Sequence, residues 1–234
     1  IVLAAFGLPG RQRKDADNAA TSSGDRLTRG CALRMASRHR HYWLLNGGFF
    51  VCGFHVAFVG THLPAFLVDQ GLDAHIGAWS LALIGLFNIL GSYLFGLWGG
   101  RHSRPWLLSA LYASRGVAMV IFLALPLSPI TALAFAATFG FLWLGTVPLT
   151  SGAVASMFGM SQLSTLYGIV FLSHQLGAFL GAWWAGRLFD QTGSYQLIWV
   201  ISIGLAVLAS LLSALTRDQR VPVGPLRHSA EAKA

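Results

Sequence analysis

The feature that most constrains this chain is a succession of six apolar stretches, each long enough to cross a membrane as a helix. A spanning helix needs roughly 20 predominantly apolar residues. Short connections with turn-forming residues, such as Ser103-Arg104-Pro105, separate the stretches. The predicted spans are, in chain order, residues 42–68, 76–98, 106–126, 129–150, 164–188 and 195–215. The sequence therefore predicts an all-α integral membrane protein.

Composition supports a lipid-facing chain rather than a soluble one. Of the 234 residues, 55% are apolar and only 10% are charged, whereas a soluble domain carries about a quarter charged residues. The net charge of +8 is unevenly placed, because eight of the sixteen Lys and Arg residues lie between Arg11 and Arg40. This clustering ahead of the first span favours an anionic membrane surface over nucleic acid as the partner.

The same charges predict how the spans are oriented. The segment before the first span is basic, the loop after the second carries Arg101 and Arg104, and the final tail holds four more basic residues. The loops after the first and third spans contain none. Since cytoplasmic loops carry an excess of Lys and Arg, both termini are predicted to be cytoplasmic.

The segments outside the spans predict the remaining organisation. Residues 1–10 open on an apolar run without Met or a preceding basic segment, and are interpreted as the end of a preceding transmembrane helix. Residues 11–41 are interpreted as a basic, largely disordered cytoplasmic linker, with a surface helix around Leu33–Arg40 as the alternative. Residues 42–215 form the transmembrane domain, and 216–234 a cytoplasmic tail. Cys31 and Cys52 are predicted to be free thiols, and no spacing typical of a metal site occurs.

An internal repeat gives the six spans an order. Residues 88–101 (NILGSYLFGLWGGR) match 174–187 (HQLGAFLGAWWAGR) without a gap at an offset of 86 residues. The copies lie in the second and fifth spans, an odd number of spans apart, so they must cross the membrane in opposite directions. A looser similarity links Gly60-Thr61-His62-Leu63-Pro64 in the first span to Gly145-Thr146-Val147-Pro148 in the fourth. The pattern predicts two inverted three-helix repeats, a construction common in secondary transporters.

Two inverted triplets after a basic linker resemble the C-terminal half of major facilitator superfamily (MFS) transporters. The run from Gly96 to Arg104 resembles their cytoplasmic gating motif, represented here by Gly96, Gly100, Arg101 and Arg104. Gly100 stands where an acid often occurs, so the resemblance implies the basic ends of the gate without an acid–base latch inside the motif. It also implies a missing N-terminal six-helix half and a location in the bacterial cytoplasmic (inner) membrane.

Shorter segments resemble the bacterial monocarboxylate and oxalate–formate members of the family. They are Gly53-Phe54-His55 through Pro64, Thr146-Val147-Pro148-Leu149-Thr150, and Asp190 through Tyr195. The resemblance implies a small organic anion as the solute, moved by rocking alternating access and coupled to an ion gradient. Where those members carry cationic side chains in the pathway, this chain has Asn88 and His174-Gln175.

Polar side chains inside predicted spans supply the candidate pathway residues, because such residues are costly in a membrane and often functional. These candidates are His55, Asn88, Thr146, His174 and Gln175. For His55 and His174 the alternative is a neutral histidine hydrogen-bonded across helices, and His62 is predicted at the outer rim. Arg115, midway along the third span, either extends to the cytoplasmic interface or pairs across the bundle.

Two other functions compete with transport. A six-helix scaffold or subunit would need only the packing of the spans. An intramembrane serine hydrolase would need a serine–histidine pair, for which Ser151 and His174 are the candidates, but Leu149 occupies the position where the nucleophile motif has glycine. No phosphate-binding glycine loop is present in the sequence. The predicted protein is therefore not an enzyme, uses no cofactor or metal, and takes a small-molecule solute and the lipid bilayer as its partners.

Overall fold

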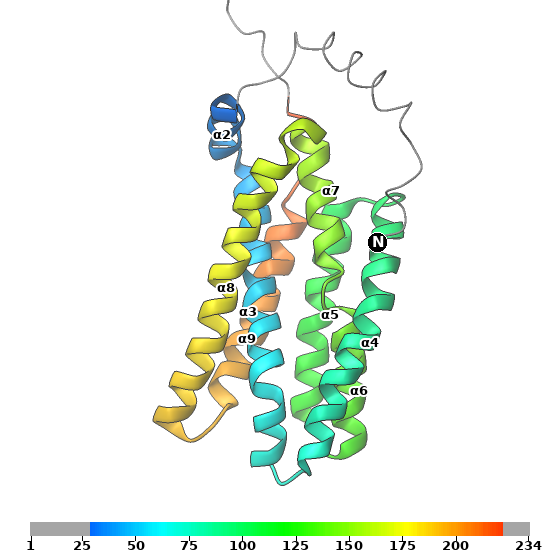
Figure 1. The fold of residues 1–234 in the computed structure, drawn as a ribbon, viewed down its shortest axis with the longest axis vertical. Coiled ribbons are helices and arrows are strands. Elements are labelled where there is room, and N and C mark those ends of the chain that lie inside the picture. Colours follow the sequence, from blue (N-terminus) through cyan, green and yellow to red (C-terminus); the bar gives the residue numbers. More distant parts are fainter. Residues whose placement is uncertain (1–28, 222–234) are drawn as a thin grey trace, which may run out of the picture.

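The computed structural model describes residues 29–221, and within this range the chain forms a bundle of long helices (Figure 1). Residues 1–28, with the predicted end of a preceding helix, and the tail from 222 lie outside the described residues. The helices are α2 (Arg29–Arg38), α3 (Arg40–Asp69), α4 (Ala74–Gly99), α5 (Arg104–Ala124), α6 (Pro129–Phe141), α7 (Thr146–Phe158), α8 (Leu163–Thr192) and α9 (Gln196–Ala214), with a single 3-10 turn at Met160–Gln162. Six spans are long and apolar enough to cross a membrane, with α6 and α7 together making the fourth. The predicted all-α membrane protein with six spans is confirmed.

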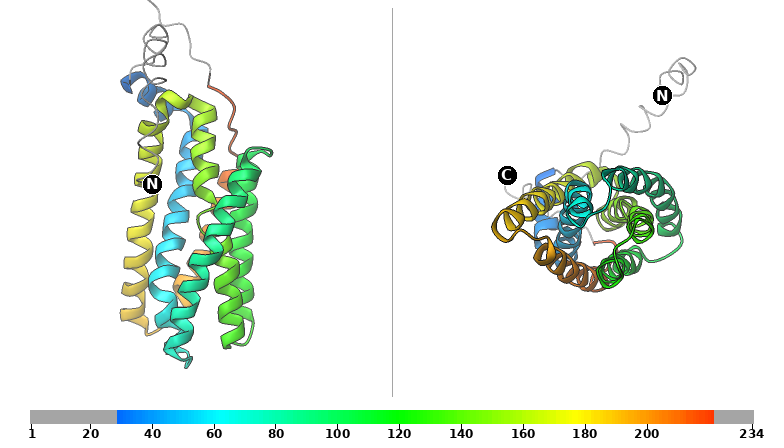
Figure 2. Two further views of the ribbon diagram at one scale, coloured as in Figure 1. Left: turned by 45° about the vertical axis from the view of Figure 1, so that its right-hand side comes forward. Right: turned by 90° about the horizontal axis from the view of Figure 1, so that it is seen from below.

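Successive spans run in opposite directions (Figures 1 and 2). The start of α3, the α4–α5 loop, the α7–α8 connection and the end of α9 therefore lie at one end of the bundle, which we call the basic end because it carries Arg40, Arg101 and Arg104. Arg187, in the last turns of α8, lies toward the opposite end. The two arginines that match in the repeat, Arg101 and Arg187, are thus separated as the inverted arrangement requires.

Side chains at the connections explain where several spans begin. Asp73 caps α4 by accepting a hydrogen bond from the backbone N–H of His75 at 2.8 Å. Ser128 and Thr131 form a reciprocal capping box at the start of α6, where Pro129 occupies the first turn. These caps satisfy helix-terminal N–H groups that would otherwise be exposed near the membrane surface.

The fourth span is longer than predicted and is broken in its middle. The prediction of 129–150 ends too early, because α7 continues to Phe158. Between α6 and α7 the chain leaves helical geometry over residues 142–145. Pro148 explains the break, because its ring has no N–H to donate and clashes with the carbonyl group four residues earlier, that of Leu144.

Helix pairing follows the inverted repeat. The closest pairs are α3 with α8, α4 with the fourth span, and α5 with α9. These pairs follow the repeat symmetry. Exchanging the two three-span repeats turns the pair of α3 with α8 into the pair of the fourth span with α4, and it maps the pair of α5 with α9 onto itself. The equivalent glycines Gly91 and Gly177 occupy equivalent crossings: an added Cβ would overlap the carbonyl oxygen of Phe141 or of Phe50, respectively. Close backbone packing at small residues holds both crossings together.

These crossings also fix the register between the first and fourth spans. Gly91 meets Phe141 where Gly177 meets Phe50, so equivalent positions in these two spans differ by 91 residues. The looser similarity of Gly60-Thr61 to Gly145-Thr146 has an offset of 85 and does not mark equivalent positions. Membrane sequences draw on few residue types, and a shared Gly-Thr with a nearby Pro is too short to define a register.

The flanking segments are more ordered than predicted. The last third of the linker forms α2, which packs on α3 and α8 through Ala32 and Ala36, both 1% exposed. The start of the tail is fixed as well, because the N–H of Val221 donates to the carbonyl of Met157 at 2.9 Å. Small residues at a four-residue spacing give α2 a face that fits against the bundle, which supports the alternative of a surface helix.

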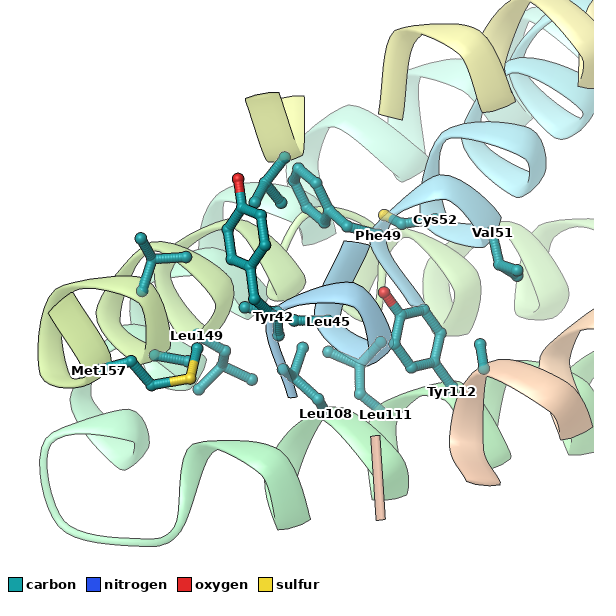
Figure 3. Packing of buried hydrophobic residues seen from close by; sticks show 14 of the residues in the cluster. Tyr42, Leu45, Phe49, Val51, Cys52, Leu108, Leu111, Tyr112, Leu149 and Met157 are labelled. Carbon is teal, nitrogen blue, oxygen red and sulfur yellow. The ribbon is translucent and has the colours of Figure 1, made fainter. Parts of the chain in front are cut away.

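Two clusters of buried side chains fill the bundle. One, toward the basic end, joins Tyr42, Phe49 and Cys52 of α3 to residues of α5 and α7 such as Tyr112 and Met157 (Figure 3). The other surrounds Trp199 of α9, whose ring contacts several phenylalanine rings. The broken part of the fourth span lies beside both clusters, and polar side chains gather there.

Candidate functional site

Arg115 of α5 hydrogen-bonds to the backbone at the break in the fourth span. Its Nε and Nη2 atoms donate to the carbonyl of Leu142 at 3.0 and 2.5 Å, and Nη2 also donates to the carbonyl of Trp143. These carbonyls lie at the C-terminal end of α6, where unpaired acceptors and the helix dipole both favour a cation. Arg115 therefore caps α6 from a neighbouring helix.

Arg115 is fully buried, with 0% of its surface exposed. The guanidinium carbon lies 5.5 Å from the ring centroid of Tyr112 and 5.8 Å from that of Phe139. Between residues 29 and 221, the only ion pair formed by an arginine with a carboxylate is at Arg104, far along the sequence from this break. Of the two predicted states of Arg115, the structure shows pairing across the bundle, with backbone carbonyls and aromatic rings as partners.

Asn88 of α4 also hydrogen-bonds to the backbone at this break. Its Oδ1 accepts a hydrogen bond from the backbone N–H of Leu144 at 3.0 Å and another from Ser92 Oγ at 3.1 Å. The break leaves one backbone N–H and two backbone carbonyls without helical partners. Asn88 accepts from the N–H, and Arg115 donates to the carbonyls. Asn88, predicted to line a pathway, thus bonds to the backbone of the broken span in this structure.

His174, the repeat equivalent of Asn88, lies in α8 beside the same region. Its ring packs against Phe49 at 4.8 Å and stacks on Phe171 at 5.6 Å between centroids. Nδ1 is 3.2 Å from Gln175 Oε1, whereas Nε2 has no hydrogen-bond partner among the described residues. A buried imidazole with neutral polar neighbours retains the capacity to bind an anion or to carry a proton.

Cys52 of α3 connects this histidine to the break. Its Sγ lies 3.1 Å from Thr146 Oγ1 and 3.5 Å from Arg115 Nη1, and the thiol also interacts with His174. The cluster of Cys52, Arg115, Thr146 and His174, which we call the central polar cluster, draws one residue from each of four spans. Two of its members were predicted as pathway residues, and Cys52 was not.

The other predicted pathway residues are not part of this cluster, although Gln175 contacts its member His174. His55 is fully buried, and its Nε2 donates to the carbonyl of Ser202 in α9 at 2.9 Å, so it links two helices as the structural alternative predicted. Gln175 is exposed on α8 next to His174. His62 bonds to the Ala182 carbonyl at 3.0 Å and to Tyr195 Oη at 3.3 Å, as a partly buried residue between helices.

The geometry gives the hydrolase alternative no catalytic pair. Ser151 Oγ donates to the carbonyl of Pro148 at 3.2 Å, a bond to the preceding turn that serine side chains commonly make inside a helix. The hydrogen bond of His174 goes to its neighbour Gln175 instead. Ser151, predicted near the end of a span, lies inside α7 because the fourth span extends to Phe158.

The predicted gating motif lies at the basic end, and Arg104 is the residue that makes a specific contact. Its Nη1 pairs with Asp218 at 3.3 Å and donates to Ser156 Oγ at 3.3 Å. Gly152 leaves room for it, since an added Cβ would come within 2.7 Å of Arg104 Nε. Arg101 is exposed. The acid that the motif lacks at Gly100 is therefore supplied by the segment after α9.

The motif glycines contribute little to packing. A Cβ added to Gly96 would be 3.8 Å from Pro148, and one added to Gly100 would touch only Leu97 of its own helix. A close approach occurs at the neighbouring Gly99, where a Cβ would lie 2.7 Å from Leu149. Gly177 and Gly181 pack against the carbonyls of Phe50 and Phe54.

Comparison with known proteins bears on the whole arrangement. The family model described as Major Facilitator Superfamily matches residues 1–182 and, in a second match, 47–233. A curated relative, the "Uncharacterized MFS-type transporter YcxA" of Bacillus subtilis (strain 168), is 29% identical over 185 residues, which cover 75% of this chain and 45% of the relative. The chain thus spans less than half the length of that relative. With six membrane-spanning helices paired as inverted triplets, this chain belongs to the Major Facilitator Superfamily.

Proposed function

We propose that this chain is one half of a secondary active transporter that moves a small solute by rocking alternating access. Family membership supports a transporter, and the inverted pairing of α3–α5 with α6–α9 supports rocking of a rigid half. A preceding six-span half supplies the opposite wall of the pathway. Both ends of the chain lie on the cytoplasmic side of a bacterial inner membrane, as the distribution of Lys and Arg favours.

The observation that supports a solute class is the central polar cluster. Within the described spans it combines a buried guanidinium, a buried imidazole, a thiol and a hydroxyl, without a carboxylate. Such a set favours negative charge, and the imidazole of His174 is the member of a type that can both bind an anion and take up a proton near neutral pH. A small organic anion, such as a monocarboxylate, is therefore the substrate class, and a proton is the coupling ion that a histidine can accept.

The test uses proteoliposomes that contain the full-length transporter of which this chain is the proposed half. Uptake of labelled lactate, formate and oxalate is measured with and without an imposed pH gradient. We expect saturable, gradient-dependent uptake of at least one of them. His174→Gln removes the titratable nitrogen and should lower that uptake by about 10- to 100-fold, since a hydrogen bond to a charged group contributes about 1.5–3 kcal/mol.

The matched control is His75→Gln, which changes an exposed histidine in the first turn of α4 at the far end of the bundle. It should transport like the wild type. Absence of flux for every carboxylate under either gradient would overturn the proposed substrate class. Equal activity of the His174→Gln and His75→Gln proteins would overturn the role of His174 alone.

A further inference from the structure

The corner between α2 and α3 carries an unpaired positive charge at the basic end of the bundle. Arg34, Arg38 and Arg40 are all exposed there, and the sequence from Arg29 to Val68 contains no acidic residue. Arg34 has no ion-pair or hydrogen-bond partner for its guanidinium within residues 29–221. Burial and the neighbouring Arg40 lower the pKa of His39, so the positive charge of this corner at neutral pH comes from arginines.

The same corner contains a cavity of about 430 Å³. Its walls are α2, the first turn of α3 and one residue of α8. The side chains that line it include the apolar Leu33, Trp43 and Ile169 and the polar Arg34, Ser37 and Tyr42. The apolar three remain 37%, 55% and 36% exposed, respectively, so the cavity opens toward the bundle's surroundings.

Most polar groups around the cavity are already satisfied. Trp43 Nε1 donates to the Ser37 carbonyl at 2.8 Å, and Tyr42 Oη donates to the Leu166 carbonyl at 2.8 Å. Ser37 Oγ donates to the Arg34 carbonyl at 3.0 Å. The Arg34 guanidinium is the group left to bind a ligand, and it carries a positive charge.

The position of the cavity indicates what approaches it. Trp43 lies in the first turn of the first span, and aromatic residues at this depth sit among lipid headgroups. α2 lies across the end of the bundle rather than along it, as an interfacial helix does (Figures 1 and 2). A ligand here meets a cation on the headgroup side and apolar walls on the acyl-chain side.

We infer that the α2–α3 corner is a binding site for an anionic phospholipid, whose phosphate group pairs with Arg34 while its acyl chains lie against Leu33, Trp43 and Ile169. This inference is independent of the transported solute. Charge complementarity selects an anionic over a zwitterionic headgroup, and the apolar walls distinguish a lipid from a free phosphate ion. A bound lipid would fix α2 against the spans at the basic end.

Native mass spectrometry of the intact chain in detergent tests this site. The chain is titrated with phosphatidylglycerol, with phosphatidylcholine of the same acyl chains, and with phosphatidylglycerol in the presence of millimolar inorganic phosphate. Arg34→Gln should weaken phosphatidylglycerol binding about 5-fold, since a basic side chain near a lipid surface contributes about 1 kcal/mol. Leu33→Asp, which places an acid beside Arg34, should weaken it at least as much.

Arg101→Gln is the matched control, because Arg101 is exposed at the same end but does not line the cavity. It should bind phosphatidylglycerol like the wild type. Equal loss in the Arg34→Gln and Arg101→Gln proteins would mean that only net charge matters and would overturn the site. Equally tight binding of phosphatidylcholine, displacement by inorganic phosphate, or no saturable binding because another protein segment fills the cavity would also overturn it.

Discussion

At the residue scale, Arg115 illustrates how a membrane interior accommodates a cation without a carboxylate. The C-terminal end of α6 presents carbonyls with partial negative charge, and the guanidinium donates to two of them while aromatic rings cover its faces. The planar fork of arginine suits this geometry, since several N–H groups point to neighbouring acceptors at once. The residue and the break in the fourth span therefore stabilise each other.

Replacing Arg115 should destabilise the chain, although this arginine pairs with no carboxylate among the described residues. In Arg115→Met the carbonyls of Leu142 and Trp143 lose their donors, at a cost of about 1–3 kcal/mol for each buried acceptor. Arg115→Lys keeps the charge but not the fork, so its loss should be smaller. Thermal unfolding in detergent measures both, with Val117→Met, on the exposed face of α5, as the control. An Arg115→Met protein as stable as the control would refute the capping role.

The histidines show what sequence can and cannot predict at this scale. Their positions within spans follow from hydropathy, and the depth match of Asn88 with His174 follows from the repeat. Whether a ring nitrogen meets a carbonyl depends on helix rotation, which hydropathy does not encode. His55 therefore proves to be bonded to the Ser202 carbonyl, while the ring of His174 meets side chains, those of Gln175 and Cys52. Cys52 carried no signal beyond its apolar context, and its contacts arise only from packing.

At the scale of elements, the crossing of α3 and α8 depends on small residues. Gly53 and Gly177 each face a carbonyl of the other helix, and a Cβ at either position would overlap it. Such close approach increases van der Waals contact between the helices. Inside a bilayer this contact matters, because no hydrophobic effect drives apolar helices together. The repeat made Gly177 visible in sequence, whereas Gly53 lies outside it. The break in the fourth span was not predicted, because a proline need not interrupt a span, as Pro64 in α3 shows. At Pro148 it does so where Arg115 and Asn88 bond to the backbone groups that are released.

Gly177→Ala tests this crossing directly. The added methyl group must displace the Phe50 backbone, and such overpacking costs typically about 1–3 kcal/mol. Gly168→Ala in the same helix has open space around its Cβ and should be neutral, or stabilising by up to about 1 kcal/mol. Comparing the two unfolding midpoints in detergent isolates packing from helix propensity. Equal midpoints would argue against the close crossing.

At the scale of the whole molecule, the segment after α9 ties the basic end of the bundle together. Asp218 pairs with Arg104 at the start of α5, the N–H of Val221 bonds to Met157 at the end of α7, and the N–H of Arg217 donates to His41 in α3. All these partners belong to this chain. The Arg104–Asp218 pair therefore links the start of α5 to the segment after α9 within this bundle.

Asp218→Asn should consequently loosen the basic end while leaving global stability almost unchanged. The two side chains are 30% and 24% exposed, and a solvent-accessible pair contributes only about 0.2–1 kcal/mol. Besides this pair and the Val221 hydrogen bond, few buried contacts hold residues 216–221 in place. Local opening of this segment is therefore more sensitive to the substitution than global stability is. Hydrogen exchange should accelerate in peptides that cover 216–221 and the last turn of α7. Asp190→Asn, which changes an exposed acid in the last turn of α8, should leave that exchange unchanged.

The reversed pair, Arg104→Asp with Asp218→Arg, should restore protection that either single change removes, since the attraction is regained with its polarity inverted. Persistent rapid exchange in the reversed pair would show that Arg104 acts through Ser156 and Gly152 rather than through Asp218.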